Sequence, residues 1–333
     1  MNKPLVSVII PVYNEINYIE SMVNSVLNQD QKNYFLELLV VDGGSTDGTR
    51  EKIIQLQQKH PHIQFLNNEK RIAPSAFNKG IEYANGDYIA ILGAHSNYDS
   101  NYLDTCLAEL NKNNCIACSG KVEVAKDDKD LQSVLIHCML TSKFGVSSGS
   151  YRTAKEGVGE QCPYPVFKRS VFNEVGLYNE TLIRNQDNDM NYRIRKKGYK
   201  LYYTHRVNAY YYPKQKIKDL LNYAIRTGEA NATSLKINPE SMSARHLIPF
   251  LFCSFVIASL LTIFASLLFF TSFTQIVVVS SSAILLLHLL IGFTEAIRSL
   301  SKTKQLIILV LPFLFFFFHF CYGWGTLKGL IKS

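Results

Sequence analysis

The first part of the chain alternates between short apolar runs and segments with apolar residues at helical spacing. The apolar runs are rich in β-branched residues, which is typical of buried strands. Strands that alternate with helices at this spacing predict a mostly parallel sheet with helices on both faces, which is an α/β fold. The strands are predicted at residues 5–12, 36–42, 63–66 and 87–92, and the helices at 15–29, 49–60 and 75–84.

The last part of the chain has a different pattern, because it is almost continuously apolar. Residues 247–294 and 305–327 contain no Asp, Glu, Lys or Arg. A transmembrane helix needs about 20 mostly apolar residues, so the first run can hold two spans and the second run one. We therefore expect a soluble domain over 1–230, a juxtamembrane linker over 231–246 and a membrane domain over 247–333. Its spans are predicted at about 247–270, 275–293 and 305–325.

The distribution of charge around these spans predicts their orientation. The apolar run at 5–12 leads into Tyr13-Asn14-Glu15 and lacks the layout of a signal peptide. The loop at 295–304 carries Arg298, Lys302 and Lys304, and basic loops favour the cytoplasmic side. We expect a multi-pass protein of the cell membrane with its N-terminal domain in the cytoplasm.

The chain has a net charge of +8, and basic residues are concentrated in the segment 193–218. Such a segment near a membrane span would attract anionic headgroups or a pyrophosphate-bearing lipid. Nucleic acid is the competing partner for a basic patch, but the apolar tail disfavours it. The seven cysteines are an odd number in a chain whose N-terminal domain is expected in the cytoplasm, so no disulfide framework is predicted. Cys115 and Cys118 form a lone C-x-x-C, which we interpret as packed strand residues rather than as a zinc site.

Chemically useful side chains follow three of the predicted strands. They lie in the segments Tyr13-Asn14-Glu15, Asp42-Gly43-Gly44 and Gly93-Ala94-His95. Open parallel sheets bind ligands beyond the carboxyl ends of their strands, so these segments should meet at one edge. The sequence therefore predicts a binding site there.

Four ordered blocks of the sequence resemble one known family. VSVIIPVYNE at the start, followed by LLVVDGGSTDGT, is similar to the opening of family 2 glycosyltransferases with the GT-A fold. NKGIEYANGDYIAIL and RNQDNDMNYRIRKKG resemble later blocks of that family, the second being its acidic catalytic block. Together with PVFKRSVFNEVGLYNE, the details look closest to the succinoglycan-biosynthesis type of exopolysaccharide transferase. The resemblance covers roughly residues 5–230 and implies a Rossmann-like GT-A domain.

The resemblance implies a set of residues that bind a nucleotide-sugar donor. Asp42 would contact the base or ribose, although Gly43 stands where the family usually has a second Asp. The alternative is that Asp42 and Asp47 only shape a turn and cap a helix. The donor-binding residues implied in this way are Pro11, Tyr13, Glu15, Asp42, Asn78 and Arg71.

The expected metal site departs from the family pattern. Family members usually carry D-x-D after the fourth strand, where this chain has Gly93-Ala94-His95. The resemblance implies that His95 contacts the metal or the diphosphate, and imidazole suits Mn²⁺ better than Mg²⁺. A divalent ion, Mn²⁺ or Mg²⁺, is therefore expected as the cofactor. A hydrogen-bonded structural histidine is the alternative.

The acidic block implies the catalytic residue. Gln186 replaces the usual Glu, while Asp187 matches the general base that takes the proton of the acceptor hydroxyl. Asp189 and Arg193, at spacing i and i+4, are interpreted as a surface ion pair. Acceptor or diphosphate contacts are assigned to Arg152, Gln186, Asp189 and Arg193, and the segment at 155–159 is expected to be a flexible loop over the donor.

These expectations combine into one functional hypothesis and two alternatives. The hypothesis is an inverting transfer of a sugar from a nucleoside diphosphate to a polyprenyl-pyrophosphate-linked or other lipid-linked acceptor, in cell-surface polysaccharide biosynthesis. A processive polysaccharide synthase is disfavoured, because Trp324 lies in the apolar tail and the Q-x-x-R-W motif is absent. A membrane-tethered protein that binds nucleotide sugars with weakened turnover is the other alternative.

Overall fold

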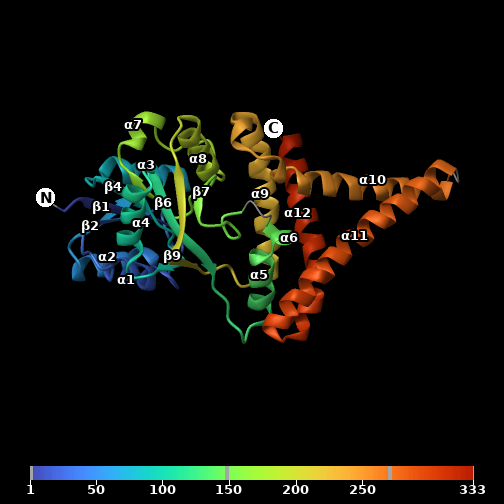
Figure 1. Cartoon of the computed structure of the whole chain (residues 1–333), viewed down its shortest axis with the longest axis horizontal. Helices are drawn as coiled ribbons and strands as arrows, with labels where there is room; N and C mark the ends of the chain where they lie inside the picture. The colour runs from blue at the N-terminus through green and yellow to red at the C-terminus, as the bar shows by residue number, and fades with distance from the viewer. Residues whose placement is uncertain (1–2, 147–149, 269–271, 333) are drawn as a thin grey trace. The chain divides into compact units, whose positions relative to one another are not determined.

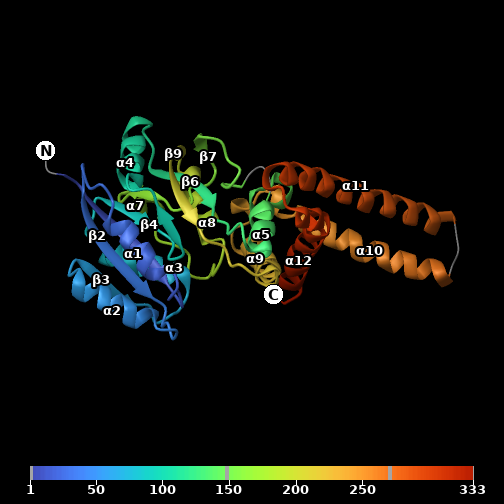
Figure 2. The same ribbon diagram turned by 90° about the horizontal axis from the view of Figure 1, so that it is seen from below.

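The computed structural model describes residues 3–146, 150–268 and 272–332, with side chains except at 266–274. The chain forms two units, shown as ribbons in Figures 1 and 2. The first unit comprises Met1–Ala125 and Ala154–Pro213, and the second comprises Lys126–Thr153 and Lys214–Ser333.

The first unit is built on a nine-stranded mixed sheet with the order β3-β2-β1-β4-β8-β6-β9-β5, and β7 pairs with β9. β1 pairs in parallel with β2 and β4, and β2 with β3. β8 runs antiparallel to β4 and β6, which makes the sheet mixed beyond β4. The strands are β1 (Leu5–Val12), β2 (Phe35–Asp42), β3 (Ile63–Asn67), β4 (Tyr88–Ile91), β5 (Ser96–Tyr98), β6 (Ala117–Val124), β7 (Gly157–Gly159), β8 (Val166–Lys168) and β9 (Leu201–Tyr211).

Helices cover both faces of this sheet because alternate strand residues point to opposite faces. Val8 and Ile10 pack with α1, α2 and α4 in one fully buried cluster. Ile9, between them, packs with α3, α7 and α8 in the other cluster. The helices are α1 (Ile19–Leu27), α2 (Thr49–Lys59), α3 (Ala73–Tyr83), α4 (Tyr102–Lys112), α7 (Val171–Val175) and α8 (Gln186–Lys196). The predicted α/β class is confirmed.

The antiparallel part of the sheet was not anticipated. The segment at 155–159, expected to be a flexible loop, contributes β7, whose three residues pair with Leu201–Tyr203 of β9. Glu156 also accepts a hydrogen bond from Thr204 on β9 (3.1 Å). The backbone pairing holds this segment against the sheet, so the expectation of a loop was wrong here.

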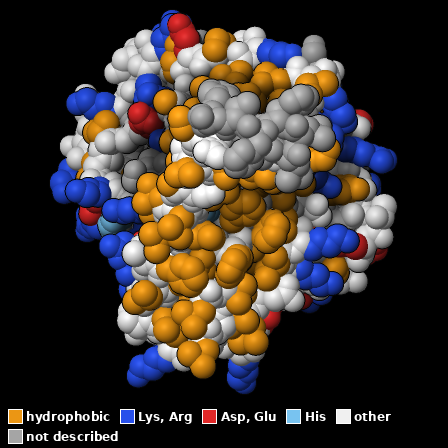
Figure 3. Space-filling view, turned by 90° about the vertical axis from the view of Figure 1, so that its right-hand side faces the viewer, with side chains coloured by type: hydrophobic (Ala, Val, Ile, Leu, Met, Phe, Trp, Pro, Cys, Tyr) orange, Lys and Arg blue, Asp and Glu red, His pale blue; other side chains and the backbone are white. Residues whose placement is uncertain are grey.

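The second unit consists of α5 (Leu131–Thr141), α6 (Lys143–Val146), α9 (Ile217–Ile237), α10 (Ile248–Leu268), α11 (Ser272–Thr303) and α12 (Leu311–Lys332). Three segments are long and apolar enough to cross a membrane: Ala244–Ala265, Gln275–Thr303 and Leu306–Lys332. Figure 3 views the molecule from the side of α10 and α11, and apolar side chains gather on that face. The three spans agree with the expectation, but the predicted loop at 295–304 is largely the last part of α11.

The packing of α9 against α12 explains why the observed units differ from the predicted boundary at residue 230. A Cβ at Gly228 would lie 2.1 Å from the carbonyl oxygen of Tyr322, and one at Gly325 would lie 2.1 Å from that of Ile225. The two backbones therefore touch where both helices carry glycine. Asn231 adds a hydrogen bond to the Tyr322 hydroxyl (2.9 Å). Because α9 is bound to the tail in this way, it belongs to the second unit from its start.

Candidate active site

The carboxyl ends of β1 and β2 are joined by polar contacts. Asn14 adopts a left-handed conformation (φ 55°), which turns the chain sharply after β1. Its amide donates to Ser45 Oγ (2.9 Å), and its side-chain oxygen accepts from the Thr46 amide (2.8 Å). Tyr13 is left 54% exposed at this edge, as a base-stacking residue needs to be.

The two aspartates of the following turn are structural in their contacts. Asp42 is fully buried and accepts hydrogen bonds from the Ser45 amide (3.1 Å) and hydroxyl (2.6 Å), with Arg50 at 3.8 Å. Asp47 accepts from the Thr49 hydroxyl (2.5 Å) and the Ile16 amide (3.2 Å). Burial would raise the pKa of Asp47, but these hydrogen bonds outweigh it and lower the pKa. These contacts match the alternative role in a turn and a cap, and a direct contact of Asp42 with a nucleobase stays a prediction.

Arg71 lies beside this turn, as the donor-site prediction requires. It has a left-handed backbone (φ 57°), and its guanidinium Nε is 3.3 Å from where a Cβ at Gly44 would lie. A Cβ at Gly43 would be in ordinary van der Waals contact, 3.5 Å from atoms of Tyr13 and Val12, so a side chain fits there without a clash. A cation and an aromatic ring thus lie beside the 43–44 turn.

Glu15 and His95 are in direct contact. His95 Nδ1 lies 3.1 Å from Glu15 Oε1, and the side chains of His95 and Glu15 are 38% and 21% exposed. The His95 ring packs near Tyr18 (6.5 Å between centroids) and Tyr211 (5.3 Å). Two residues predicted for separate roles, one for the base and one for the metal, are therefore a single pair.

This pair suits a divalent cation that also takes oxygens from a diphosphate. A carboxylate that holds one ring nitrogen of a histidine orients the other nitrogen toward a metal. In the described ranges, Nε2 of His95 makes no hydrogen bond to the protein. No group of three or more His, Cys, Asp and Glu side chains gathers among the described residues, so the substrate would have to complete the coordination.

Asp187 lies in the first turn of α8, where a negative charge is favoured. Its side chain is exposed, and Oδ1 accepts from the amide of Asn188 (2.9 Å). Burial raises the pKa of the Tyr178 hydroxyl, and the nearby charge of Asp187 raises it further. Asp187 is thus a solvent-facing carboxylate beside a buried tyrosine.

Two contacts link the start of α8 to the end of β4 through the segment 161–164. Gln161 Nε2 donates to Asn188 Oδ1 (3.1 Å). Three residues further along, the ring of Tyr164 lies 2.8 Å from where a Cβ at Gly93 would be. The segment from Gln161 to Tyr164 therefore links the first turn of α8 to the end of β4, and a common site for Asp187 and His95 stays a prediction.

The segment between α7 and α8 is fixed to α3 by Asn78. Its amide donates to the carbonyl of Tyr178 (2.9 Å) and to Glu180 (3.1 Å), and its oxygen accepts from the Tyr178 amide (2.8 Å). Lys70 forms an ion pair with Glu180 as well. These contacts position the segment that leads to Asp187, while donor binding by Asn78 stays a prediction.

The Asp189–Arg193 pair exists but is not the surface pair that we expected. Arg193 Nε donates to Asp189 at 2.8 Å, and the Asp189 side chain is only 4% exposed. Arg193 also donates to backbone carbonyls of Val175 and Leu177. The pair therefore anchors the chain after α7.

Oε1 of Gln186 is buried with no partner in the part of the chain that the structure describes, which marks it as a candidate ligand contact.

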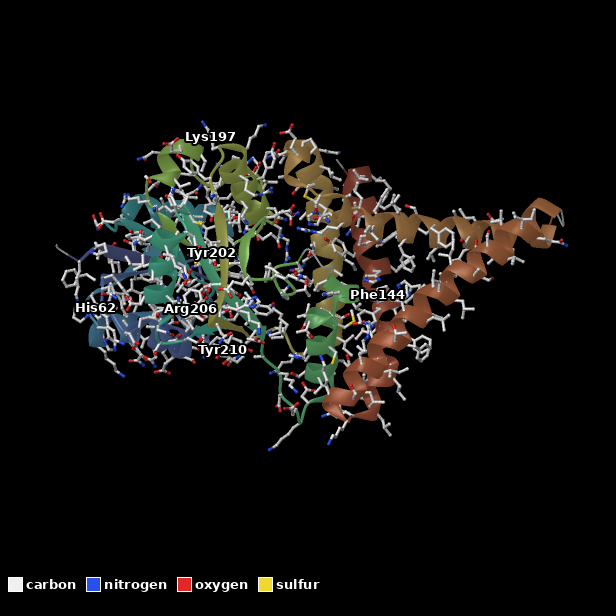
Figure 4. All side chains as sticks on the ribbon, in the orientation of Figure 1. His62, Phe144, Lys197, Tyr202, Arg206 and Tyr210 are labelled. Carbon is white, nitrogen blue, oxygen red and sulfur yellow. The ribbon has the colours of Figure 1, made fainter. Side chains whose placement is uncertain are left out.

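Other expected residues lie elsewhere. Arg152 belongs to the second unit, where its guanidinium lies over the ring of Tyr151 (4.7 Å), and its predicted diphosphate contact stays untested. In the basic segment, Arg206 on β9 pairs with Glu109 on α4 (2.7 Å); Figure 4 labels it between Tyr202 and Tyr210. Cys115 and Cys118 are buried free thiols of the core, as interpreted, and the pKa of each is raised: for Cys115 by burial, and for Cys118 by hydrogen bonding to Cys106 and burial.

The sheet and its carboxyl edge are those of GT-A glycosyltransferases. A mannosyltransferase from Pyrobaculum calidifontis, solved in complex with GDP-Man and Mn²⁺, superposes with a TM-score of 0.58 over 100% of this chain and 88% of its own, at 17% sequence identity. At that identity the likeness concerns the fold.

The chain belongs to glycosyl transferase family 2, whose family model matches residues 7–176. A dolichyl N-acetyl-alpha-D-glucosaminyl phosphate 3-beta-D-2,3-diacetamido-2,3-dideoxy-beta-D-glucuronosyltransferase of Methanococcus voltae is 30% identical over 98% of both chains. The succinoglycan biosynthesis protein ExoA of Rhizobium meliloti (strain 1021) is 27% identical over 77% of this chain and 78% of its own. The protein is therefore a glycosyltransferase.

Proposed function

We propose that this glycosyltransferase moves a sugar, with inversion at the anomeric carbon, from a nucleoside-diphosphate sugar to a lipid-linked saccharide in cell-surface polysaccharide biosynthesis. The observation that carries the proposal is the Glu15–His95 pair, which joins the end of β1 to the segment after β4, with Tyr13 exposed at the end of β1. The pair would suit a diphosphate and Tyr13 a base, and exposed Asp187 in the first turn of α8 would supply a carboxylate for an alcohol.

Asp187 acts as the general base. The acceptor hydroxyl oxygen forms a bond to the anomeric carbon, and its proton passes to the Asp187 carboxylate. The bond from the anomeric carbon to the diphosphate oxygen breaks, and the nucleoside diphosphate leaves with the electron pair. A carboxylate is needed because an alcohol is a poor nucleophile at neutral pH.

The donor is held by the ends of β1, β2 and β4. Tyr13 stacks on the base, and Arg71 places positive charge beside the 43–44 turn, where the diphosphate would be bound. His95, oriented by Glu15, would hold a divalent cation, Mn²⁺ in preference to Mg²⁺, that neutralises charge on the diphosphate when bound.

The acceptor is proposed to be lipid-linked because the chain carries three helices able to span a membrane. The name of the Methanococcus relative includes a dolichyl-phosphate-linked sugar, which supports an acceptor of that class. We also propose that the first unit faces the cytoplasm, on the side where the basic residues at 295–304 are expected.

A nucleotide-sugar-binding protein without turnover is the competing proposal, since Gly43, Gly93 and Gln186 depart from the family pattern. Asp187 weighs against it, because the acidic block keeps a carboxylate at this position and its side chain is exposed in the first turn of a helix.

The test is transfer of radiolabelled sugar from a panel of nucleotide sugars into lipid extracts of membranes that contain the full chain. Asp187→Asn should lower turnover by roughly 10²–10⁴-fold while donor binding is kept, because only proton transfer is lost. Asp128→Asn removes an equally exposed carboxylate from the second unit, where it pairs with Lys126, and should leave transfer unchanged. Full activity of Asp187→Asn would refute this assignment.

A further inference from the structure

The residue at position 93 is glycine because a tyrosine from a distant segment fills the space next to it. A Cβ at Gly93 would lie 2.8 Å from Cε1 of Tyr164, closer than real Cβ atoms approach. A Cβ at Gly43, after β2, would lie no nearer than 3.5 Å to any other atom, which is ordinary van der Waals contact. The two glycines therefore differ: a Cβ fits at 43 without a clash, and a side chain at 93 needs the place of the Tyr164 ring.

Tyr164 is held in that place by contacts to its hydroxyl, its ring and its carbonyl oxygen. Ser96 Oγ donates to its hydroxyl (3.0 Å), and the Tyr98 ring packs edge-on at 5.7 Å between centroids. The Tyr102 hydroxyl donates to its carbonyl oxygen (2.9 Å). Tyr98 in turn accepts from the amide of Gly93 (2.8 Å), so the ring and the strand end form one assembly.

The backbone of Tyr164 is strained, which indicates that its placement is maintained against a cost. Its φ is 49°, a left-handed conformation that non-glycine residues rarely adopt. The next residue is Pro165, and a residue before proline is normally pushed to an extended conformation. Strain of this kind persists where the surroundings enforce it, and it concentrates at functional sites.

We propose that Tyr164 takes the place of the missing carboxylate at position 93 and sets the metal preference of the site; the proposal rests on the donor site described above. Tyr164 is a positioning residue. It fixes the turn from Gly93 to Ser96, so that His95, between them, faces the donor diphosphate with its ring held by Glu15. With a phenol in place of a hard oxygen ligand, the protein contribution to the metal is an imidazole, which favours Mn²⁺ over Mg²⁺.

The test exchanges the two side chains. Binding of uridine and guanosine diphosphate, each with Mn²⁺ or with Mg²⁺, is measured by calorimetry on the full chain in detergent. Gly93→Asp alone should weaken Mn²⁺–nucleotide binding at least about tenfold, because the carboxylate and the ring cannot share the space. The double variant Gly93→Asp/Tyr164→Ala should recover binding to within about threefold of the unaltered protein and lower its preference for Mn²⁺ over Mg²⁺ about tenfold.

Two further variants separate this effect from a loss of folding. Gly43→Asp makes the same change of residue type where a Cβ meets no atom nearer than 3.5 Å, and should leave the circular dichroism spectrum and melting temperature unchanged. Tyr164→Ala creates no clash and should fold, yet weaken Mn²⁺–nucleotide binding about tenfold, while Tyr164→Phe should keep the Mn²⁺ preference. A nitrogen coupling in the electron paramagnetic resonance of bound Mn²⁺ should persist in the double variant, since His95 remains.

The outcomes distinguish this inference from the proposed function. If the unaltered protein binds neither nucleotide with Mn²⁺, the donor site itself is wrong and both proposals fail. The role of Tyr164 is refuted, while the donor site stands, if the unaltered protein and Gly93→Asp bind the Mn²⁺–nucleotide with equal affinity. It is also refuted if the double variant binds no more tightly than Gly93→Asp. Unchanged metal preference in a double variant that binds would equally overturn it.

Discussion

The contact between Glu15 and His95 changes the interpretation of both side chains. From the sequence, Glu15 was assigned to the nucleobase pocket and His95 to the metal. The 3.1 Å contact between Oε1 and Nδ1 makes the carboxylate a partner of the ring. A hydrogen bond of this kind fixes the tautomer and raises the basicity of the opposite nitrogen.

We therefore expect Glu15→Gln to weaken metal binding without removing a metal ligand. The apparent dissociation constant for Mn²⁺ in the presence of a nucleoside diphosphate should rise about 10–100-fold. Calorimetric titration of the full chain measures this change. Glu20→Gln alters an exposed carboxylate of α1 that pairs with Lys52, and should leave the constant unchanged. Equal affinities for Glu15→Gln and the unaltered protein would contradict the positioning role.

The sequence predicted which residues gather at the site better than it predicted their contacts. The ends of the apolar runs located Tyr13, Asp42 and His95, because parallel strands end at one edge. The sequence could not predict that Asp42 would be buried beneath Ser45, since that depends on how the turn folds back. Tyr164 was missed for a similar reason. The role proposed for it depends on how close its ring lies to where a Cβ at position 93 would be, and the only local signal was its position between two prolines.

At the scale of elements, a buried carboxylate holds the sheet together at the edge opposite the site. Glu37 on β2 accepts hydrogen bonds from Ser7 on β1, from Gln64 on β3 (3.0 Å) and from the amide of Asn85 (2.9 Å) before β4. Burial would raise the pKa of Glu37, but these hydrogen bonds outweigh it and lower the pKa below its ordinary value of 4.5.

This shift predicts how stability depends on pH. A depressed pKa in the folded state means that the contribution is present above pH 4.5 and is lost as the pH falls through the lower, folded-state pKa. Glu37→Gln should reduce the free energy of unfolding at pH 7 by about 1–3 kcal/mol and make it less dependent on pH below 4.5. Urea denaturation of the first unit, followed in the full chain, checks this, with exposed Glu82→Gln as the control. A parallel pH dependence in both variants would count against it.

The packing of α9 on α12 leads to a second prediction at this scale. Gly228→Leu should drive the helices apart, because even a Cβ would lie 2.1 Å from a carbonyl oxygen of α12. We expect a loss of melting temperature of several degrees in detergent, as overpacking costs about 1–3 kcal/mol. Gly159→Leu on β7, where nothing lies within 4 Å of an added Cβ, should be tolerated. Equal melting temperatures would show that the contact does not contribute to stability.

Elements with long apolar runs were predicted well, and short antiparallel strands were not. Strands β1 to β4 each follow from a short, mostly apolar segment, broken only by Ser7, Glu37 or Gln64 in its interior. β7 and β8 have three residues each, too few for a hydrophobic period to be visible, and their pairing depends on distant partners. The assignment of 126–153 to the second unit was equally hidden, since α5 and α6 resemble helices of a soluble domain in sequence.

For the whole molecule, the proposed orientation can be tested by labelling single introduced cysteines. Gln275 and Ser301, near opposite ends of α11, are exposed, whereas six native cysteines are buried and Cys321 is half-buried. In intact cells, a membrane-impermeant maleimide should label Gln275→Cys, and Ser301→Cys should react only after permeabilisation. The unaltered chain gives the background. The reverse pattern would place the basic end of α11, and with it the proposed cytoplasmic side, outside.

The glycine contact between α9 and α12 also bears on how the protein is made. A ribosome completes α9 before it has begun α12, and α10 and α11 are synthesised in between. Until α12 arrives, the close-packing surface of α9 around Gly228 lacks the backbone that it fits. Chains that stop before α12 would leave this surface uncovered, so we expect them to be removed by chaperones and proteases faster than the full chain.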